Sequence, residues 1–360
     1  EDSTFAMAAY YRALSHAGVD HGAFRDDLYL AARLADQATE QERLLIQAAH
    51  AAALDDPIQR VYAESLAVQY PTEPDGHLFL GKSRLSSGEF LEALPHLRRV
   101  IEMDSMSLRG TMARCLACEA ADDIVTAYIR ADSLPAAERT ARWWTEVQPG
   151  SAHAWHALAR TLEYQSRFDE ARAARGQAAL RRSDNPRDPL FPTVLALRAG
   201  DFARADRLLD ELEEPGASLV QQNVAWYRVL SAYYQGRIEE ALVEARRYTE
   251  LVQGAETSGQ FLPMLYVLEA ILLLETDDPR RAADLWHQMA DIEFDPDSPA
   301  RSARHRTWTL THAAVAHAAA GDTAALPALA DSIQADGAKS AFGRDPRLHH
   351  FVRGLLLAAR

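Results

Sequence analysis

A short turn recurs along the chain at a fixed distance from a small residue, and this repetition restricts the possible folds. Three of the turns begin at Gly88, Gly200 and Gly236, and an alanine follows each glycine five positions later. Ser166 opens a fourth turn with the same spacing to Ala171. Each turn lies between two segments with the apolar periodicity of an α-helix. The sequence therefore predicts stacked helix–turn–helix units, because one such unit cannot bury its apolar face alone.

The residues around these turns predict how the two helices of a unit pack. A glycine at the end of a helix can adopt a positive φ and so terminate it. An alanine five positions later allows close approach of the two helices, which a larger side chain would overpack. The four alanines at this position are Ala93, Ala171, Ala205 and Ala241. Two weaker units are expected towards the end of the chain, where Asp277 leads to Ala282 and Gly321 leads to Leu326.

Two units in the first half resemble tetratricopeptide repeats. The unit from Pro74 carries Leu80-Gly81, Gly88-Glu89-Phe90 and Ala93, and the unit from Ala152 carries Trp155, Leu158-Ala159, Phe168, Ala171 and Ala178. Repeat starts near residues 40, 74, 118, 152, 186 and 222 follow, and four of these five intervals are 34 to 36 residues. The resemblance implies an all-α chain that forms a right-handed solenoid of stacked antiparallel helix pairs, with a concave groove that binds a protein or peptide.

The sequence predicts that the chain has two parts. Residues 1–185 are expected to hold the N-terminal repeats and residues 186–360 the C-terminal repeats, with a bend near 183–192, where three prolines lie close together. The long interval between the repeats that start near 74 and 118 predicts one long helix from Ser107 to Arg130. Both ends of the sequence look cut from a longer protein, and the repeats resemble the repeat regions of large bacterial signalling proteins such as Ser/Thr kinases or transcriptional activators.

The net charge of −14 bears on the class of partner. An acidic chain repels a phosphate backbone, so general nucleic-acid binding is not expected. Four arginines, Arg98, Arg99, Arg181 and Arg182, are candidates for a local basic patch, but solvated helix faces account for them. No run of 18 apolar residues exists, so no membrane span is expected in these residues.

One segment matches the pattern of a phosphate-binding loop. Gly76 to Ser83 reads G-x-x-x-x-G-K-S, which in nucleotide-binding proteins follows a buried strand. Here Pro71 and Pro74 precede it, and a central strand does not tolerate prolines. Leu80-Gly81 also falls in register with the helical repeat. A helix interior is therefore predicted, and a nucleotide site that uses Gly81, Lys82 and Ser83 remains the alternative.

No other motif points to catalysis, a metal or a cofactor, and none of these is expected. Cys115 and Cys118 form a C-x-x-C without the second ligand pair of a zinc site. On the predicted long helix they are expected to pack as small apolar residues. His153 and His156 are three positions apart, but no third ligand is evident.

In the tetratricopeptide family the first helix of each pair lines the groove, and the matching positions here are candidate partner-binding residues. The candidates are Leu78, Lys82, His153, His156, Arg160, Trp226 and Tyr233. Aromatic side chains are strong interface anchors. The helix with Trp226 and Tyr233 is unusually aromatic, and packing between repeats explains this composition equally well.

Three functions follow from these observations. The first is a non-enzymatic scaffold or sensor that binds a protein or peptide partner, which can be a domain of the same polypeptide. The second is the nucleotide-responsive module described above. The third is self-assembly into a homo-oligomer through uncapped ends or an exposed apolar face.

Overall fold

The structure is a computed structural model that describes residues 5–17, 21–109, 114–181, 190–215, 219–253, 265–292, 294–295 and 297–358. The described residues form helices joined by turns and contain no strand. They divide into two compact units, unit 1 (Glu1–Asp184 with Ala341–Gly343) and unit 2 (Asn185–Ser340 with Arg344–Arg360). Most of the predicted bend at 183–192 lies outside the described residues, so the bend stays a prediction.

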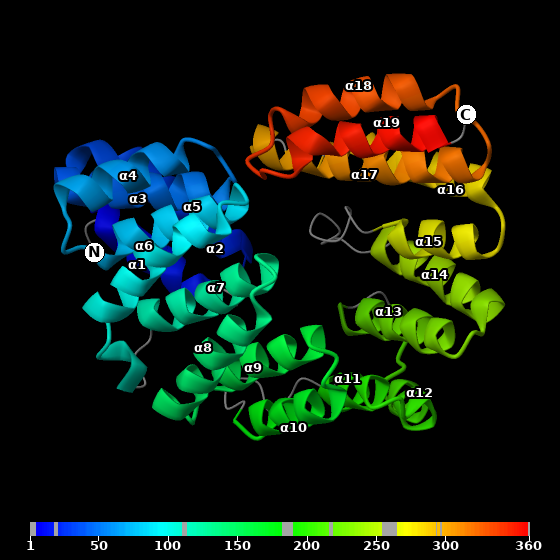
Figure 1. Ribbon diagram of the computed structural model, residues 1–360, viewed down its shortest axis with the longest axis horizontal. Coiled ribbons are helices and arrows are strands. Elements are labelled where there is room, and N and C mark those ends of the chain that lie inside the picture. The colour runs from blue at the N-terminus through cyan, green and yellow to red at the C-terminus, as the bar shows by residue number, and fades with distance from the viewer. Residues whose placement is uncertain are drawn as a thin grey trace. The chain divides into compact units, whose positions relative to one another are not determined.

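The described residues of unit 1 form ten α-helices, and each helix contacts the next one along the chain (Figure 1). Its helices are α1 (Ala6–His16), α2 (His21–Leu34), α3 (Glu40–Ala53), α4 (Gln59–Gln69), α5 (Pro74–Ser86), α6 (Phe90–Met103), α7 (Leu116–Arg130), α8 (Leu134–Val147), α9 (Ala152–Tyr164) and α10 (Phe168–Ala179). The contacts α3·α5, α5·α7 and α7·α9 also join every second helix, as stacked hairpins require.

In the described residues of unit 2, each helix likewise contacts the next one along the chain. Its helices are α11 (Phe191–Arg198), α12 (Phe202–Glu211), α13 (Leu219–Tyr234), α14 (Ile238–Gln253), α15 (Val267–Glu275), α16 (Pro279–Ala290), α17 (Pro299–Ala319), α18 (Leu326–Gly337) and α19 (Leu348–Ala358). The described residues show α15 from Val267 onward, and residues 260–264 lie outside them.

The recurring turn has the backbone that the sequence predicts. Gly88, Gly200, Gly236 and Gly321 all have φ between 72° and 82°, and Ser166 reaches 59°. At Gly88 the amide donates to Leu85 O, and the amide of the next residue, Glu89, donates to Arg84 O. This pair of bonds satisfies carbonyls that the end of a helix leaves unpaired.

The small residues after the turns are the contact points predicted from sequence. The four alanines and the two weaker counterparts are all at most 2% exposed: Ala93, Ala171, Ala205, Ala241, Ala282 and Leu326. A further turn of this kind, not recognised in the sequence, has Asp132 at a φ of 54° and leads to the fully buried Ala137. The predicted all-α array of antiparallel helix pairs is confirmed, and the handedness of the solenoid stays a prediction.

The segment that matched a phosphate-binding loop is helical. Gly76 to Ser83 lies inside α5, whose first residue is Pro74. A Cβ added to Gly81 would lie 2.6 Å from Leu97 Cδ2, and one added to Gly76 would lie 2.9 Å from Ala67 N. These glycines allow neighbouring helices to approach α5 closely, so the segment has no loop to hold a phosphate.

The prediction of one long helix from Ser107 to Arg130 is wrong. A short 3₁₀ helix covers Ser107–Arg109, and α7 begins only at Leu116. The side chain of Ser107 donates to the carbonyl oxygen and to the carboxylate of Asp104, so this segment forms a turn and does not continue a helix. Cys115 therefore precedes α7 as its N-cap residue and lies outside a helix interior.

Candidate functional site

The first helices of three successive pairs in unit 1 place charged side chains in one row. The helices α5, α7 and α9 alternate with α6 and α8, and α7 contacts both α5 and α9. We call Lys82, Glu119, Asp122, Asp123 and Arg160 on these helices the charged row. Because residues three and four positions apart share a helix face, Glu119, Asp122 and Asp123 project from one side of α7.

Two ion pairs connect the three helices through this row. Lys82 Nζ on α5 lies 2.7 Å from Glu119 Oε2 on α7. Arg160 Nη2 on α9 lies 2.8 Å from Asp122 Oδ1 on α7 and donates to Thr126 Oγ1 at 3.1 Å. The side chains of the four charged partners are 38% to 44% exposed, so solvent reaches both pairs. Such pairs are screened and contribute little to stability, which leaves their charges accessible to a partner.

Asp123 differs from the carboxylates in the two ion pairs because one of its oxygens, Oδ2, is buried and accepts no hydrogen bond from the described residues. Burial raises the pKa of Asp123 to about 6, with the nearby Asp122 and Glu119 carboxylates adding to the effect and Lys82 opposing it. The face that carries the row therefore changes charge near pH 6.

The same carboxylates act on Lys82. Burial alone would lower the pKa of Lys82, but the attraction of the Glu119 and Asp123 carboxylates outweighs burial, and its pKa is raised. Lys82 is therefore protonated throughout the neutral pH range. At neutral pH the charged row carries three negative and two positive charges.

A polar cavity lies on the same unit, beyond the N-terminal end of α7. It has a volume of about 280 Å³ and its lining includes Tyr10, Glu73, Asp75 and Arg114. Arg114 Nη2 lies 2.5 Å from Asp75 Oδ1. Burial and the charge of Asp75 raise the pKa of Glu73. Tyr10 is almost fully buried, and burial raises the pKa of its hydroxyl above the usual value.

The structure brings together only some of the candidate residues predicted from the sequence. Lys82 and Arg160 belong to the charged row, and on α9 His153 is exposed and His156 is partly buried. Leu78 does not lie on an accessible face, since it is 1% exposed and packs in the cluster around Leu97 and Val100. Its apolar side chain fills the space between α5 and the helices packed on it.

The two aromatic candidates lie on α13 in unit 2. Trp226 and Tyr233 are partly buried, and both pack against the largest apolar cluster of that unit. The Trp226 ring meets Tyr248 on α14 edge to face, with 5.5 Å between ring centroids. These rings therefore contribute to packing between helices, which was the alternative interpretation of this aromatic helix.

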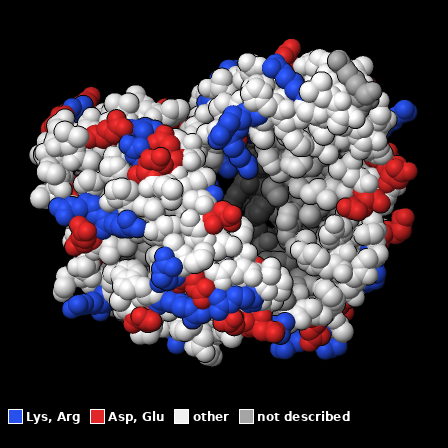
Figure 2. Space-filling view, in the orientation of Figure 1, with Lys and Arg blue, Asp and Glu red and all other residues white. Residues whose placement is uncertain are grey.

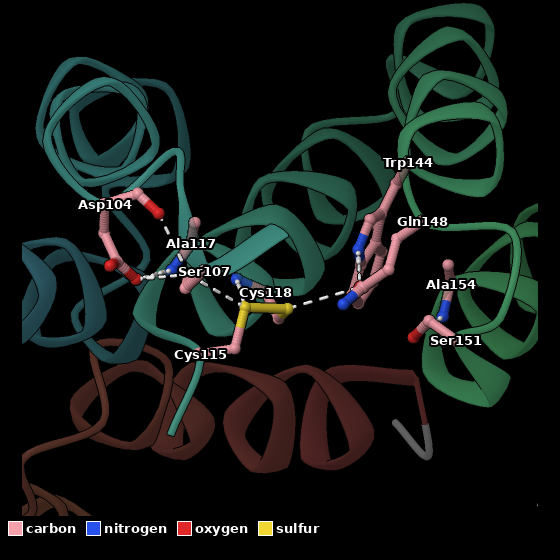
Figure 3. Close-up of a disulfide and its surroundings, with 9 residues drawn as sticks. All are labelled: Asp104, Ser107, Cys115, Ala117, Cys118, Trp144, Gln148, Ser151 and Ala154. Atoms are coloured by element: carbon pink, nitrogen blue, oxygen red, sulfur yellow. Dashed lines mark hydrogen bonds between the residues drawn. A yellow bond between two sulfur atoms is a disulfide. The ribbon is translucent and has the colours of Figure 1, made fainter. Parts of the chain in front are cut away.

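The sequence reasoning missed a disulfide between Cys115 and Cys118, which Figure 3 shows. Both cysteines are partly buried and contact the apolar cluster around Trp144, as expected for small apolar residues, but they are bonded to each other. The error follows from the wrongly predicted long helix. Gly110, an unfavourable residue inside a helix, was the signal that the helix begins later.

Within the described ranges, no three His, Cys, Asp or Glu side chains are placed to hold a metal ion together. Over the same part of the chain, every helix is too short or too polar to cross a membrane. On the face shown in Figure 2, Lys and Arg lie close to Asp and Glu and do not gather into an extended basic patch.

The chain matches no protein-family profile and no curated protein. Similar solved structures include a tetratricopeptide repeat protein from Parabacteroides merdae, with 16% identity over 76% of this chain and 100% of that one, at a TM-score of 0.44. Pseudomonas aeruginosa pilF matches with 19% identity over 62% of this chain and 93% of that one, at a TM-score of 0.35. The Cut9-Hcn1 hetero-tetramer of APC/C matches with 12% identity over 99% of this chain and 68% of that one, at a TM-score of 0.41.

The helix pairs of the chain itself define its class. Repeated hairpins with a left-handed turn residue and a buried small residue five positions later make it a helical-repeat protein with a tetratricopeptide-like fold.

Proposed function

We propose that unit 1 is a protein-binding scaffold and that the charged row is its docking surface. The observation that carries this proposal is the pair of half-exposed ion pairs, Lys82–Glu119 and Asp122–Arg160, on three successive first helices. A helical-repeat array presents such a surface as a rigid support. The partner can be a separate protein or another domain of the same polypeptide.

The charges favour a partner segment with basic side chains. Glu119, Asp122 and Asp123 give α7 three carboxylates, and the chain as a whole has a net charge of −14. A field of this sign steers basic segments towards the protein and raises the association rate. Because the ion pairs within the row are exposed, a basic partner can compete for their carboxylates at little cost in stability.

A binding titration with charge variants tests the docking surface. The probes are fluorescent 12-residue peptides of basic, acidic and neutral composition, and the protein is the full chain. We expect saturable binding of basic peptides that weakens with added salt. The affinity should fall about tenfold in Glu119→Lys, since the substitution replaces an attractive carboxylate by a positive charge that repels the peptide. The matched control is Glu102→Lys, an exposed residue at the C-terminal end of the second helix α6.

Two results would contradict the proposal. Equal loss of binding in both variants would indicate a general charge effect and no defined surface. Unchanged binding in Glu119→Lys, with the fold retained by circular dichroism, would place the docking surface elsewhere. If the row is correct, affinity capture from a lysate with the wild type and the same two variants then identifies the natural partner.

The self-assembly hypothesis stays a prediction. The last helix, α19, has an exposed Phe351 and an exposed Leu357, which are the kind of apolar side chains that an interface between two copies would cover. Light scattering across a range of protein concentrations checks this. A molecular mass equal to one chain at every concentration would exclude it.

A further inference from the structure

The disulfide of unit 1 joins two residues at the very start of α7. Cys115 is the N-cap residue of the helix and Cys118 lies in its first turn, with two residues between them (Figure 3). Both cysteines are partly buried. No proposed contact of the docking surface uses either sulfur.

This disulfide has a minor part in holding the fold. A disulfide stabilises mainly by closing a loop in the unfolded chain, and the effect grows with the length of the loop. A loop with only two intervening residues therefore adds little stability. The first turn of α7 is also held independently, because Asp104 Oδ2 accepts the Ala117 amide at 3.0 Å. We therefore expect the fold to tolerate reduction.

The surroundings of Cys115 favour a thiolate at that sulfur once the bond is open. Cys115 Sγ lies 3.1 Å from the Cys118 amide, which donates to it at the N-terminus of α7. The unpaired amides at this end of a helix carry partial positive charge, which stabilises an anion there. The nearby Asp104 carboxylate is engaged with the Ala117 amide and with the Ser107 hydroxyl.

The surroundings of Cys118 favour the protonated thiol instead. Its Sγ lies 3.3 Å from Gln148 Oε1, an oxygen that also accepts a hydrogen bond from Trp144 Nε1 at 3.1 Å. In the dithiol form, the S–H group of Cys118 can donate to this oxygen. The two sulfurs therefore have different environments, one suited to an anion and one suited to a proton donor.

We infer that Cys115 and Cys118 form a redox-active site that exchanges with dithiols and disulfides. In the reduced protein the Cys115 thiolate attacks one sulfur of a substrate disulfide, forms a mixed disulfide and releases the other substrate sulfur as a thiolate. The Cys118 thiol then loses its proton and attacks Cys115 Sγ, which releases the second substrate sulfur. One protein dithiol and one substrate disulfide thus become one protein disulfide and one substrate dithiol. Two electrons pass to the substrate; one substrate thiolate takes the proton of Cys118, and the other takes from solvent the proton that Cys115 had released there.

A redox titration of the full chain tests whether the bond exchanges in the folded protein. The probe is dithiothreitol at a series of reduced-to-oxidised ratios, with free thiols counted by alkylation and mass spectrometry and the fold followed by circular dichroism. We expect reversible conversion between no free thiol and two free thiols, with the helical signal unchanged. Two free thiols at every ratio, or a bond that opens only when the helical signal is lost, would overturn the inference.

Alkylation rates test the separate roles of the two sulfurs. With iodoacetamide at pH 7, we expect Cys115 in Cys118→Ser to react about tenfold faster than Cys118 in Cys115→Ser, because only the thiolate reacts. Peptide mapping of the reduced wild type after brief alkylation gives the same comparison without any substitution. Equal rates at the two sulfurs, or faster reaction at Cys118, would overturn the assignment of Cys115 as the nucleophile.

Discussion

The first helices of unit 1 and helix α13 of unit 2 occupy the same place in their repeats but carry different side chains. On α5, α7 and α9 the charged row is half-exposed and paired across helices. On α13 the corresponding positions carry Trp226 and Tyr233, whose rings pack against the apolar cluster of unit 2. The aromatic side chains of α13 therefore contribute to packing, whereas the charged side chains of α5, α7 and α9 remain half-exposed.

The largest expected effect is a loss of stability in the packed region around Trp226. Trp226→Ala should lower the free energy of unfolding of unit 2 by about 3 kcal/mol, because truncating a packed aromatic ring removes apolar contacts and leaves a cavity. Urea denaturation followed by circular dichroism measures this. Tyr234→Ala, next to the packed Tyr233 but 60% exposed, is the control and should change the midpoint little. Equal effects of the two substitutions would mean that α13 is not packed as described.

The next effect concerns Asp123, the member of the charged row with a buried carboxylate oxygen. Burial raises the pKa of Asp123 from 3.8 to about 6. Between these two pH values the folded protein keeps a proton on this carboxyl group that the unfolded chain has lost. This contribution to stability is present below pH 4 and is lost as the pH rises through 6. Asp123→Asn should therefore stabilise the fold at pH 7.5 by on the order of 2 kcal/mol.

The pH dependence of the stability difference between the wild type and Asp123→Asn is the more decisive measurement. Thermal unfolding of the wild type and of Asp123→Asn should show a gap in midpoint that closes as the pH falls from 7 to 4. A gap of constant size across this range would show that the substitution acts through packing. A destabilised variant at pH 7.5 would show that Asp123 is held by partners that outweigh its burial.

A third prediction compares two glycines within helices of unit 1. Gly81→Ala should destabilise by about 1–3 kcal/mol, since the new Cβ would lie 2.6 Å from Leu97 Cδ2 in a filled core. Gly176→Ala on α10 meets nothing within 4 Å and should stabilise by about 0.5–1 kcal/mol. Denaturant midpoints of the two variants check the opposite signs. Stabilisation by both substitutions would mean that α5 does not approach α6 as closely as the structure shows.

The smallest effect concerns the exposed part of the charged row. Lys82→Ala should change the free energy of unfolding by less than about 1 kcal/mol, because its ion pair with Glu119 is exposed to solvent. Thermal unfolding at low and at high salt measures this. A loss of several kcal/mol would mean that the pair holds α5 and α7 together and is not available to a partner.

The fold was largely predictable because its determinants are local. Turn residues with a positive φ and the buried residue five positions later can be recognised within one hairpin, as at Gly88 and Ala93. The candidate site was predictable only in part. Spacing places Lys82 and Arg160 on first helices, but burial depends on neighbouring helices, so Leu78 and Lys82 on the same helix have opposite environments.

The remaining misses also have physical reasons. A charged residue and then a phenylalanine follow Gly88 and Ser166, whereas Ser133 and Leu134 follow Asp132, so this turn was missed although its spacing to Ala137 matches the others. The start of α7 depends on a turn stabilised by Asp104 and Ser107, and helical periodicity alone does not reveal it. Once that start was misplaced, Cys115 and Cys118 could not be recognised as a pair at the beginning of a helix.

Hydrogen exchange of the full chain, with and without the basic peptide that binds most tightly in the titration above, tests the central claim most directly. The claim predicts slower exchange on α5, α7 and α9 when the peptide is bound, with α13 unchanged. Protection of α13, with no change on α5, α7 and α9, would contradict it.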